Sequence, residues 1–447
     1  MIDLPGERLT EEQRRPLVDD DGRALLRSLL EHAHAPRFNH TCGDRLTAAG
    51  LDAVRAFDAE VRNGSTDGTE QPAWLDAFAA DCTRRVPAYR RHGPLPRRFD
   101  EVPTVDRSAL VAQPWSFVPD DHPLDEMVVF TTTGTTGGRL AYIASTPATA
   151  ASYAVLLRAA LATRGLTLDG GPGRTAVATV CWQKRTYTYA SPSTFLDQGA
   201  ILKLNLNPDE WNDPGDVARF LASVDPEVLT GDPVAFARLA DLDVDLHPKA
   251  LVSTAMALTD GLCDRLEARF GCPAIDVYGM NEAGPIAAAV GDGSGHIVLQ
   301  PRLHVEVLGP DGHPVGPGQR GEVTLTGGFN PAFPLLRYRT GDHASLGRHP
   351  DGRQLLVGLE GRAPVRLVNV EGRALTTIDV TVALHPFALA RSRLHQAADH
   401  SLVLGIEGSG IDESRLRAAL ADLFGAVPLT IEPMAGEPYQ VPYTSDL

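Results

Sequence analysis

From residue 125 onward, short apolar runs alternate with segments in which apolar residues recur at helical spacing. In chain order these segments predict strand 127–130, helix 149–164, strand 175–180, helix 217–224, strand 227–230, strand 251–253, helix 258–270 and strand 274–278. Strands that alternate with helices favour a largely parallel sheet covered by helices. The pattern therefore predicts an α/β fold, in which ligands usually bind to loops that follow the strand ends.

The two ends of the chain differ from this central part. Residues 1–70 carry apolar residues at helical spacing, and a further helix is expected at 74–85. Beyond residue 300 the helical pattern fades, and antiparallel strands are expected at 305–308 and 322–325. We therefore predict three parts, which are a helical extension packed on the large domain (1–70), a large multi-layered domain of mixed sheets and helices (71–361), and a small C-terminal α+β domain (362–447).

Composition and charge exclude several classes of function. Hydrophobic residues make up 43% of the chain and charged residues 22%, which is typical of a globular protein. The formal net charge of −16 argues against a nucleic-acid partner and against an anionic membrane surface. The five cysteines form no CxxC pair, the first residues lack an apolar core of signal-peptide type, and no long apolar run is present. We expect a soluble protein of the cytoplasm.

The strongest local motif is a run of five threonines and three glycines at 131–138, directly after the predicted strand 127–130. Glycines let backbone N–H groups turn toward an anion, and threonine hydroxyls add donors, so such a loop suits a polyphosphate. The lysine of the P-loop pattern is absent. A surface loop without a ligand is the other interpretation of the run.

Two carboxylates stand beside glycine turns farther along the chain. Glu282 ends the segment 277–282, which follows a predicted strand, and Asp342 ends the segment 335–342. A carboxylate in such a place often binds a metal or a ribose. Each of the two could equally cap a helix or lie in a solvated turn. The order of the three motifs along the chain favours a shared site.

With these three motifs, the sequence resembles the adenylate-forming superfamily of acyl-CoA synthetases and adenylation domains. Within it, the phenylacetate–CoA ligase and coenzyme F390 synthetase branch carries a loop like Thr132–Gly137, a Tyr-Gly-x-x-Glu like Tyr278–Glu282 and a stretch like Phe333–Asp342. The resemblance covers roughly residues 75–380. It implies a mobile C-terminal domain and an ATP- and Mg²⁺-dependent ligase that forms an acyl-adenylate and pyrophosphate. The acyl group would then pass to CoA, a carrier thiol or an amine.

The resemblance also assigns roles to individual positions. It implies catalytic roles for Arg139, Glu282 and Arg362, with Glu282 as the Mg²⁺ ligand. Asp342 would bind the ribose, Asp276 would face the adenine amino group, and Asn281 would stand where relatives have Thr or Ser. The nucleotide-binding set comprises Thr132, Thr133, Gly134, Thr135, Thr136, Gly137, Ser253, Thr254, Ala255, Asp276, Tyr278, Gly279, Asn281 and Asp342.

The acid and its acceptor are less defined by the sequence. Trp182, Tyr187, Tyr189 and Met280 are the candidate lining of the acid pocket and suggest an aryl or small planar acid. Aromatic residues pack protein cores as often, so core packing is the alternative for these positions. The expected partners are a small carboxylic acid, then CoA, a carrier protein or an amine, and a homodimer is a further expectation.

Several departures from the family pattern concern positive charge. Only three of the 41 basic residues are lysines, at 184, 203 and 249, so the lysine that relatives carry near the chain end is missing. Arg139 stands near the position of a second family lysine, and Ala363, Pro364 and Val365 replace the hinge acids. Three hypotheses follow. The enzyme adenylates with arginines such as Arg139, Arg362 or Arg373, it joins the acid to a nitrogen nucleophile, or it binds nucleotide with little or no adenylation.

Four side chains near the start of the chain raise the question of a metal. His32, His34, His40 and Cys42 are residue types that coordinate zinc. Residues of these types are more often exposed positions of helices and loops, and the sequence leaves the two interpretations open.

Overall fold

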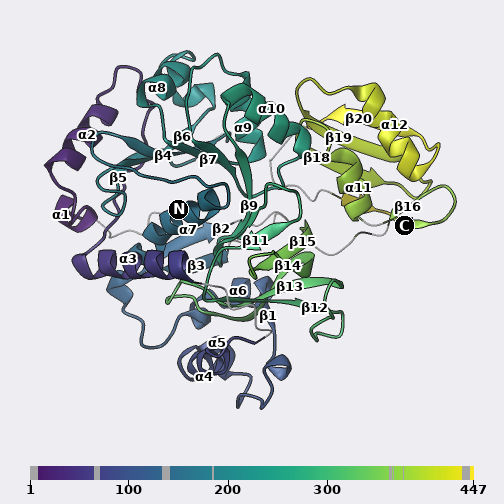
Figure 1. Cartoon of the computed structure of the whole chain (residues 1–447), viewed down its shortest axis with the longest axis horizontal. Helices are drawn as coiled ribbons and strands as arrows, with labels where there is room; N and C mark the ends of the chain where they lie inside the picture. The colour runs from purple at the N-terminus through teal and green to yellow at the C-terminus, as the bar shows by residue number, and fades with distance from the viewer. Residues whose placement is uncertain are drawn as a thin grey trace.

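The computed structural model describes residues 9–64, 71–132, 141–183, 186–361, 365, 367–375, 377–434 and 443–447. Figure 1 shows a broad sheet with helices packed around it and a separate, smaller sheet to one side at the C-terminal end. The helices are α1 (Glu11–Arg14), α2 (Asp20–Leu30), α3 (Ala48–Asn63), α4 (Leu75–Arg85), α5 (Pro87–Arg90), α6 (Arg107–Ala112), α7 (Pro147–Ala162), α8 (Asp216–Val224), α9 (Pro233–Asp241), α10 (Asp260–Phe270), α11 (Thr377–Leu384) and α12 (Glu413–Phe424).

The large sheet has two halves that differ in strand direction. Its parallel half is formed by β4 (Thr175–Cys181), β6 (Ala200–Asn205), β7 (Val228–Gly231), β8 (Ala250–Ser253) and β9 (Ala274–Met280). From β9 onward the neighbours are antiparallel, and they are β10 (Gly284–Ala289), β11 (His296–Val298), β15 (Gln354–Glu360), β14 (Leu335–Arg348), β13 (Arg320–Gly327) and β12 (Leu303–Leu308). Strand β5 (Tyr189–Pro192) pairs antiparallel with β6 at one edge, and β1 (Val105–Asp106) pairs with β14.

The predicted α/β fold is confirmed, since each segment of alternating pattern forms an element close to its expected bounds. Local chemistry explains several of these bounds. Thr146 caps α7 by accepting a hydrogen bond from the Thr149 amide at 3.1 Å, and Pro147 occupies the first helical position. Asp232 caps α9 in the same way at 2.8 Å. Helix α10 ends at Gly271, whose positive φ suits the left-handed helix stop.

The segment that follows the Thr/Gly run differs from the expectation. The sequence pattern predicts strand, loop and then helix, but a second strand, β3 (Ala141–Ser145), precedes α7 and pairs antiparallel with β2 (Val128–Thr132). This hairpin is a two-stranded sheet of its own and is not part of the large sheet. The five residues of β3 are too short a run, and too close to the glycines, for periodicity to reveal.

A buried ion pair lies beneath β14. Arg337 and Glu306 are 2% and 6% exposed, and the guanidinium Nε lies 3.3 Å from Glu306 Oε2. Arg337 Nη1 also donates to the carbonyl oxygens of Asp100 (2.8 Å) and Val102 (2.7 Å). Burial raises the pKa of Glu306, and burial beside Arg337 lowers the pKa of neighbouring His304 to about 4. The pair ties β12 and β14 to the chain segment that precedes β1.

The C-terminal part forms a separate small α+β unit, as the sequence predicts. Its sheet has the order β20 (Leu429–Pro433), β19 (Leu402–Gly408), β18 (Leu389–Gln396) and β21 (Tyr443–Ser445). Helices α11 and α12 pack on it, and Leu394, Leu404, Leu416 and Phe424 belong to its core. The short strands β16 (Leu367–Val368) and β17 (Ala374–Leu375) pair beside this unit. The boundaries at 70/71 and 361/362 remain predictions.

None of the helices in the described part of the chain is both long enough and apolar enough to cross a membrane.

Candidate active site

The turn between β9 and β10, where the parallel half of the sheet meets the antiparallel half, holds a buried carboxylate. Glu282 is 4% exposed, and its Oε1 accepts hydrogen bonds from the Tyr338 hydroxyl at 3.1 Å and from Arg107 Nη1 at 3.0 Å. Arg107 begins α6, and Tyr338 lies on β14. The guanidinium supplies the charge that a buried carboxylate requires.

Asp342, the second predicted carboxylate, is bound by a tyrosine of β9, just as Glu282 after β9 is bound by a tyrosine of β14. The Tyr278 hydroxyl on β9 donates to Asp342 Oδ2 on β14 at 2.7 Å. A tyrosine of β14 therefore bonds the carboxylate that follows β9, while a tyrosine of β9 bonds the carboxylate of β14. Burial raises the pKa of Tyr278 and of Tyr338 well above the usual value, so both hydroxyls keep their protons and act as donors. These reciprocal bonds bring Glu282 and Asp342 to one end of the sheet.

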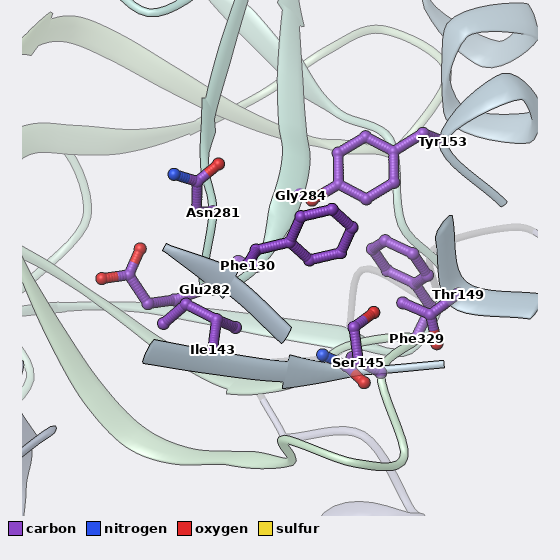
Figure 2. Close-up of a pocket in the computed structure, with 11 residues that line it drawn as sticks. Phe130, Ile143, Ser145, Thr149, Tyr153, Asn281, Glu282, Gly284 and Phe329 are labelled. Carbon is purple, nitrogen blue, oxygen red and sulfur yellow. The ribbon is translucent and has the colours of Figure 1, made fainter. Parts of the chain in front are cut away.

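A narrow pocket opens beside Glu282. Figure 2 shows the rings of Phe130, Tyr153 and Phe329 gathered on one side of it, with Asn281 and Glu282 on the other. The ring centroids of Tyr153 and Phe329 lie 5.8 Å apart in an edge-on arrangement, and Phe57 stacks on Phe329 at 5.4 Å. Burial raises the pKa of Tyr153 to about 12. The pocket therefore combines an apolar aromatic wall with a polar wall that carries one carboxylate.

Gly284 closes the floor of this pocket, and alanine is expected not to fit there. Its φ is +67°, and a Cβ would lie 2.8 Å from two carbons of the Phe329 ring. We expect Gly284→Ala to lower the free energy of unfolding by about 2–4 kcal/mol, because left-handed strain and overpacking add together. Chemical denaturation monitored by circular dichroism measures the change.

Gly271 provides the matched control for that substitution. Its φ is +66°, and in the described part of the chain no atom lies within 4 Å of the position that a Cβ would take. Gly271→Ala therefore adds backbone strain but no overpacking, and it should lower the free energy of unfolding by about 1–2 kcal/mol. Equal losses at the two positions would contradict the contact between the glycine and the aromatic wall.

Four other predicted nucleotide contacts lie on, or directly after, the strands beside this turn. Asp276 on β9 pairs with Ser253 on β8, and its Oδ2 lies 3.1 Å from His296 Nε2. The Ser253 hydroxyl is buried and has no hydrogen-bond partner among the described residues, and Ala255 adopts a φ of +71°. The Thr254 amide donates to the carbonyl oxygen of Gly231. An unsatisfied buried hydroxyl is an uncommon feature and indicates a place for a ligand atom.

The remaining predicted nucleotide and catalytic residues are placed as follows. Gly279 and Met280 end β9, where Met280 packs on the core, and Asn281 lines the pocket. Thr132 is the last residue of β2, the strand whose Phe130 lines the same pocket. The predicted site residues that lie outside the described residues are Thr133, Gly134, Thr135, Thr136, Gly137, Arg139 and Arg362.

The structure does not bring the predicted aromatic acid-pocket residues to this site. Tyr189 lies on β5, five strands from β9, which is roughly 24 Å at about 4.8 Å per strand. The rings of Tyr187 and Tyr189 both contact His40. Trp182 follows β4 and lies under the Arg238 guanidinium at 4.9 Å. Their assignment to an acid pocket stays a prediction, and the aromatic side chains beside Glu282 are Phe130, Tyr153 and Phe329.

The histidines and the cysteine near the chain start have separate neighbours. His34 Nδ1 lies 2.7 Å from Asp216 Oδ1, and His32 Nε2 lies 2.9 Å from the Ser223 hydroxyl. Burial raises the pKa of Cys42 to about 11, which disfavours the thiolate that zinc binds. Across the described ranges, no three His, Cys, Asp or Glu side chains come together in a way that suits a metal ion.

Sequence reasoning missed the partners of the two carboxylates. Tyr338 lies inside the motif 335–342, so its position in the sequence was a usable signal. Arg107 precedes Glu282 by 175 residues, and nothing local to either residue indicates that they pair. Phe130, Tyr153 and Phe329 look like core residues in the sequence, and only the fold brings them to one pocket.

Comparisons with known proteins agree with this geometry. Residues 194–330, which include Glu282, match the family model described as AMP-binding enzyme. Phenylacetate-coenzyme A ligase of Escherichia coli (strain K12) is 33% identical over 92 residues, which is 20% of this chain and 21% of that protein. Its counterpart in Pseudomonas putida is 30% identical over 132 residues, covering 27% and 30%. The aligned segments thus span less than a third of either relative.

The fold has a solved counterpart of similar extent. A 2-hydroxyisobutyryl-CoA ligase, solved in the postadenylation state, superposes with a TM-score of 0.62 at 17% identity and covers 83% of this chain and 88% of that one. At this identity the likeness concerns the fold alone. The family match and the curated relatives separately show similarity to AMP-binding enzymes and to phenylacetate-coenzyme A ligases. The resemblance predicted from the sequence motifs is therefore confirmed.

Proposed function

We propose that this protein is an ATP- and Mg²⁺-dependent ligase that activates a carboxylic acid as an acyl-adenylate. The observation that carries the proposal is the pair of reciprocal bonds, Tyr338 to Glu282 and Tyr278 to Asp342. These bonds hold the carboxylates of two family-like motifs at one end of the sheet. A pocket with an aromatic wall lies beside Glu282. Glu282 would serve the metal and Asp342 the ribose hydroxyls.

The donor set at Glu282 fits Mg²⁺. This cation takes oxygen ligands and is usually held by one or two carboxylates, with phosphate oxygens and water completing the shell. Among the described residues that line the pocket, Glu282 supplies the one carboxylate. The other metal ligands would therefore come from the triphosphate and from water. When bound, the cation would neutralise charge on the phosphate oxygens.

In the proposed reaction, an oxygen of the acid forms a bond to the α-phosphorus while the bond to the pyrophosphate oxygen breaks. Both reactants are anions, so positioning and positive charge must lower the barrier. Arg107, 3.0 Å from Glu282, is the cation that the described residues place next to this region. The buried Ser253 hydroxyl would donate to, or accept from, a bound nucleotide or acid. Transfer to CoA, a carrier thiol or an amine would complete the cycle.

The distribution of lysines supports a second candidate. No lysine follows Lys249, and relatives use a C-terminal lysine in adenylation. A protein that binds nucleotide with little adenylation is therefore the alternative, and a ligase that joins the acid to a nitrogen nucleophile is a variant of the first proposal.

Pyrophosphate release tests the proposal. The protein is incubated with ATP, Mg²⁺ and a panel of aryl and short-chain acids, and release is compared with that in the absence of acid. We expect at least one planar acid to stimulate release, and AMP formation with CoA or with an amine identifies the acceptor. Calorimetry of ATP binding is run in parallel. Binding without acid-dependent release would support the alternative, and the absence of binding would overturn both.

A further inference from the structure

A single carboxylate connects the large sheet to the C-terminal unit. Glu360, the last residue of β15, is 8% exposed, and its Oε2 lies 2.7 Å from Arg320 Nη2 within the large sheet. The same oxygen accepts a hydrogen bond from the Thr377 hydroxyl of α11 at 2.8 Å, and Oε1 accepts one from Thr381 at 3.2 Å. Thr377 and Thr381 are one helical turn apart, so both hydroxyls lie on the same face of α11.

The last strand of the chain joins the same network. The Tyr443 hydroxyl on β21 lies 2.7 Å from the Thr381 hydroxyl. A threonine hydroxyl has one proton and two acceptor positions. The Thr381 proton is shared between Glu360 Oε1 at 3.2 Å and the Thr377 carbonyl oxygen at 3.0 Å, and the Tyr443 hydroxyl donates to Thr381. Glu360 thus bonds helix α11 directly and strand β21 through one hydroxyl. The Arg320 guanidinium supplies a countercharge to the buried carboxylate, and hydrogen bonds to charged groups are stronger than neutral ones.

A second contact is a close approach of two backbones. A Cβ on Gly261 would lie 2.3 Å from the Phe387 carbonyl carbon and 2.6 Å from the Ala388 nitrogen. Gly261 lies in the first turn of α10, where backbone amides have no acceptor within the helix. Its amide donates instead to the His385 carbonyl oxygen at 3.0 Å. The Thr259 hydroxyl lies 3.0 and 3.1 Å from the carbonyl oxygens of Phe387 and Leu389. The start of α10 therefore fits the segment that enters β18, with room for glycine alone.

A third contact lies at α9. Arg238 Nη2 is 2.9 Å from Glu407 Oε1 on β19, and Arg391 Nε on β18 is 2.6 Å from the other oxygen of the same carboxylate. The Arg238 guanidinium also covers the Trp182 ring. In Figure 1 the C-terminal unit lies beside α10 and α9 and next to β15, so the three contacts are spread along one interface. Rotation of the unit requires all of them to break.

We propose that Glu360 is the central group of an interdomain lock that stabilises the C-terminal unit in the orientation of this structure and that must open for the unit to move. The lock consists of Glu360, Thr377, Thr381 and Tyr443, and it is supported by the Gly261 contact and the Arg238–Glu407 pair. A carboxylate at 360 precedes the junction at 362–365, where the family's hinge acids are replaced. It therefore anchors the unit from the large-sheet side of that junction. The proposal concerns only how the C-terminal unit docks on the large sheet. It does not depend on the proposed ligase activity.

Amide hydrogen exchange at Gly261 tests the lock, because its N–H bonds across the interface to His385. In full-length protein, Glu360→Ala is expected to raise the exchange rate of this amide by roughly tenfold or more, since charged buried hydrogen bonds are lost. Thr381→Val, which removes the link to Tyr443 and no charge, is expected to act in the same direction with a smaller effect. Amides of β7 and β8 in the large sheet should exchange as in the parent protein.

For Gly261→Ala, the expected change in amide exchange has one sign if the unit is docked and the opposite sign if it is not. Alanine normally favours a helix over glycine, so without docking the substitution would stabilise α10. With the lock closed, the methyl group must displace the Phe387 backbone, and we expect faster exchange of the interface amides at 385–389. Gly50→Ala in the first turns of α3 is the matched control, because its Cβ would meet Leu46 at an ordinary 3.4 Å.

The two sets of variants decide the question together. Unchanged Gly261 exchange in both Glu360→Ala and Thr381→Val, with slower exchange in Gly261→Ala, would overturn the lock. If Glu360→Ala loses protection throughout the large sheet as well, Thr381→Val and Gly261→Ala still report on docking alone. Faster exchange confined to the interface in these two variants supports it.

Discussion

Replacing Glu282 by alanine is expected to lower acid-dependent pyrophosphate release by about 10²–10³-fold, the usual effect of losing one electrostatic group that acts on the transition state. The carboxylate is 4% exposed and accepts hydrogen bonds from Tyr338 and Arg107, and it is the one carboxylate among the described residues that line the pocket. The measurement is steady-state release at saturating ATP, with increasing Mg²⁺. Glu282→Gln keeps the shape and the hydrogen bonds but not the charge, and it should lose nearly as much.

Glu227→Ala is the matched control for this prediction. Glu227 is also a largely buried carboxylate, paired with Lys249 at 2.6 Å, but it lies at the opposite end of the parallel strands. Its loss should lower stability and leave the rate per folded molecule close to that of the parent. A Glu282→Ala variant that keeps its activity would remove the metal and catalytic role assigned to this residue.

Arg337→Met is expected to lower the free energy of unfolding by about 3–5 kcal/mol, because it leaves the buried Glu306 carboxylate without a countercharge. The carbonyl oxygens of Asp100 and Val102 lose their donor at the same time. Arg337 also adopts a φ of +45°, so the new side chain inherits a strained backbone. Urea denaturation gives the size of the loss.

Two further variants separate the charge from the rest of this effect. The double substitution Glu306→Met with Arg337→Met removes both charges and should recover a large part of the lost stability. Arg339→Met, on the same strand and paired with Glu322 at a more exposed position, should cost less than about 1 kcal/mol. A double variant as unstable as the single one would mean that the carbonyl contacts, not the ion pair, provide the stabilisation.

The parallel half of the fold was predictable because its strands are buried on both faces and read as apolar runs. Strands β4, β7, β8 and β9 therefore stand near their expected positions. The antiparallel strands β10, β11 and β15 were not predicted. Strand β10 begins with Gly-Pro and β11 has three residues, whereas β15 is a mostly apolar run of seven residues that lies next to a glycine-rich junction. Strand β3 was missed because it is short and close to the glycines, and the Thr/Gly run was therefore assigned to a loop before a helix.

The site was predictable as a set of motifs but not as an arrangement. Glu282, Tyr278 and Asp342 could be selected because glycine turns after strands concentrate functional carboxylates. Their cross-connection through Tyr338 depends on β14 reaching the end of β9 through several intervening strands, which no local pattern encodes. The aromatic residues 182, 187 and 189 show the same limit, because an apolar ring carries no signal of which cavity it will face.

Helix α2 has a consequence that lies outside the chemistry of the site. It packs against β5, the strand that ends the parallel half of the large sheet, as Figure 1 shows for the first part of the chain. An uncovered terminal strand offers unpaired amides and carbonyls to any other chain it meets. Strand β5 is four residues long, closes with Pro192 and has this helix beside it. By covering this terminal strand, helix α2 reduces the chance that it pairs with an exposed strand of another chain.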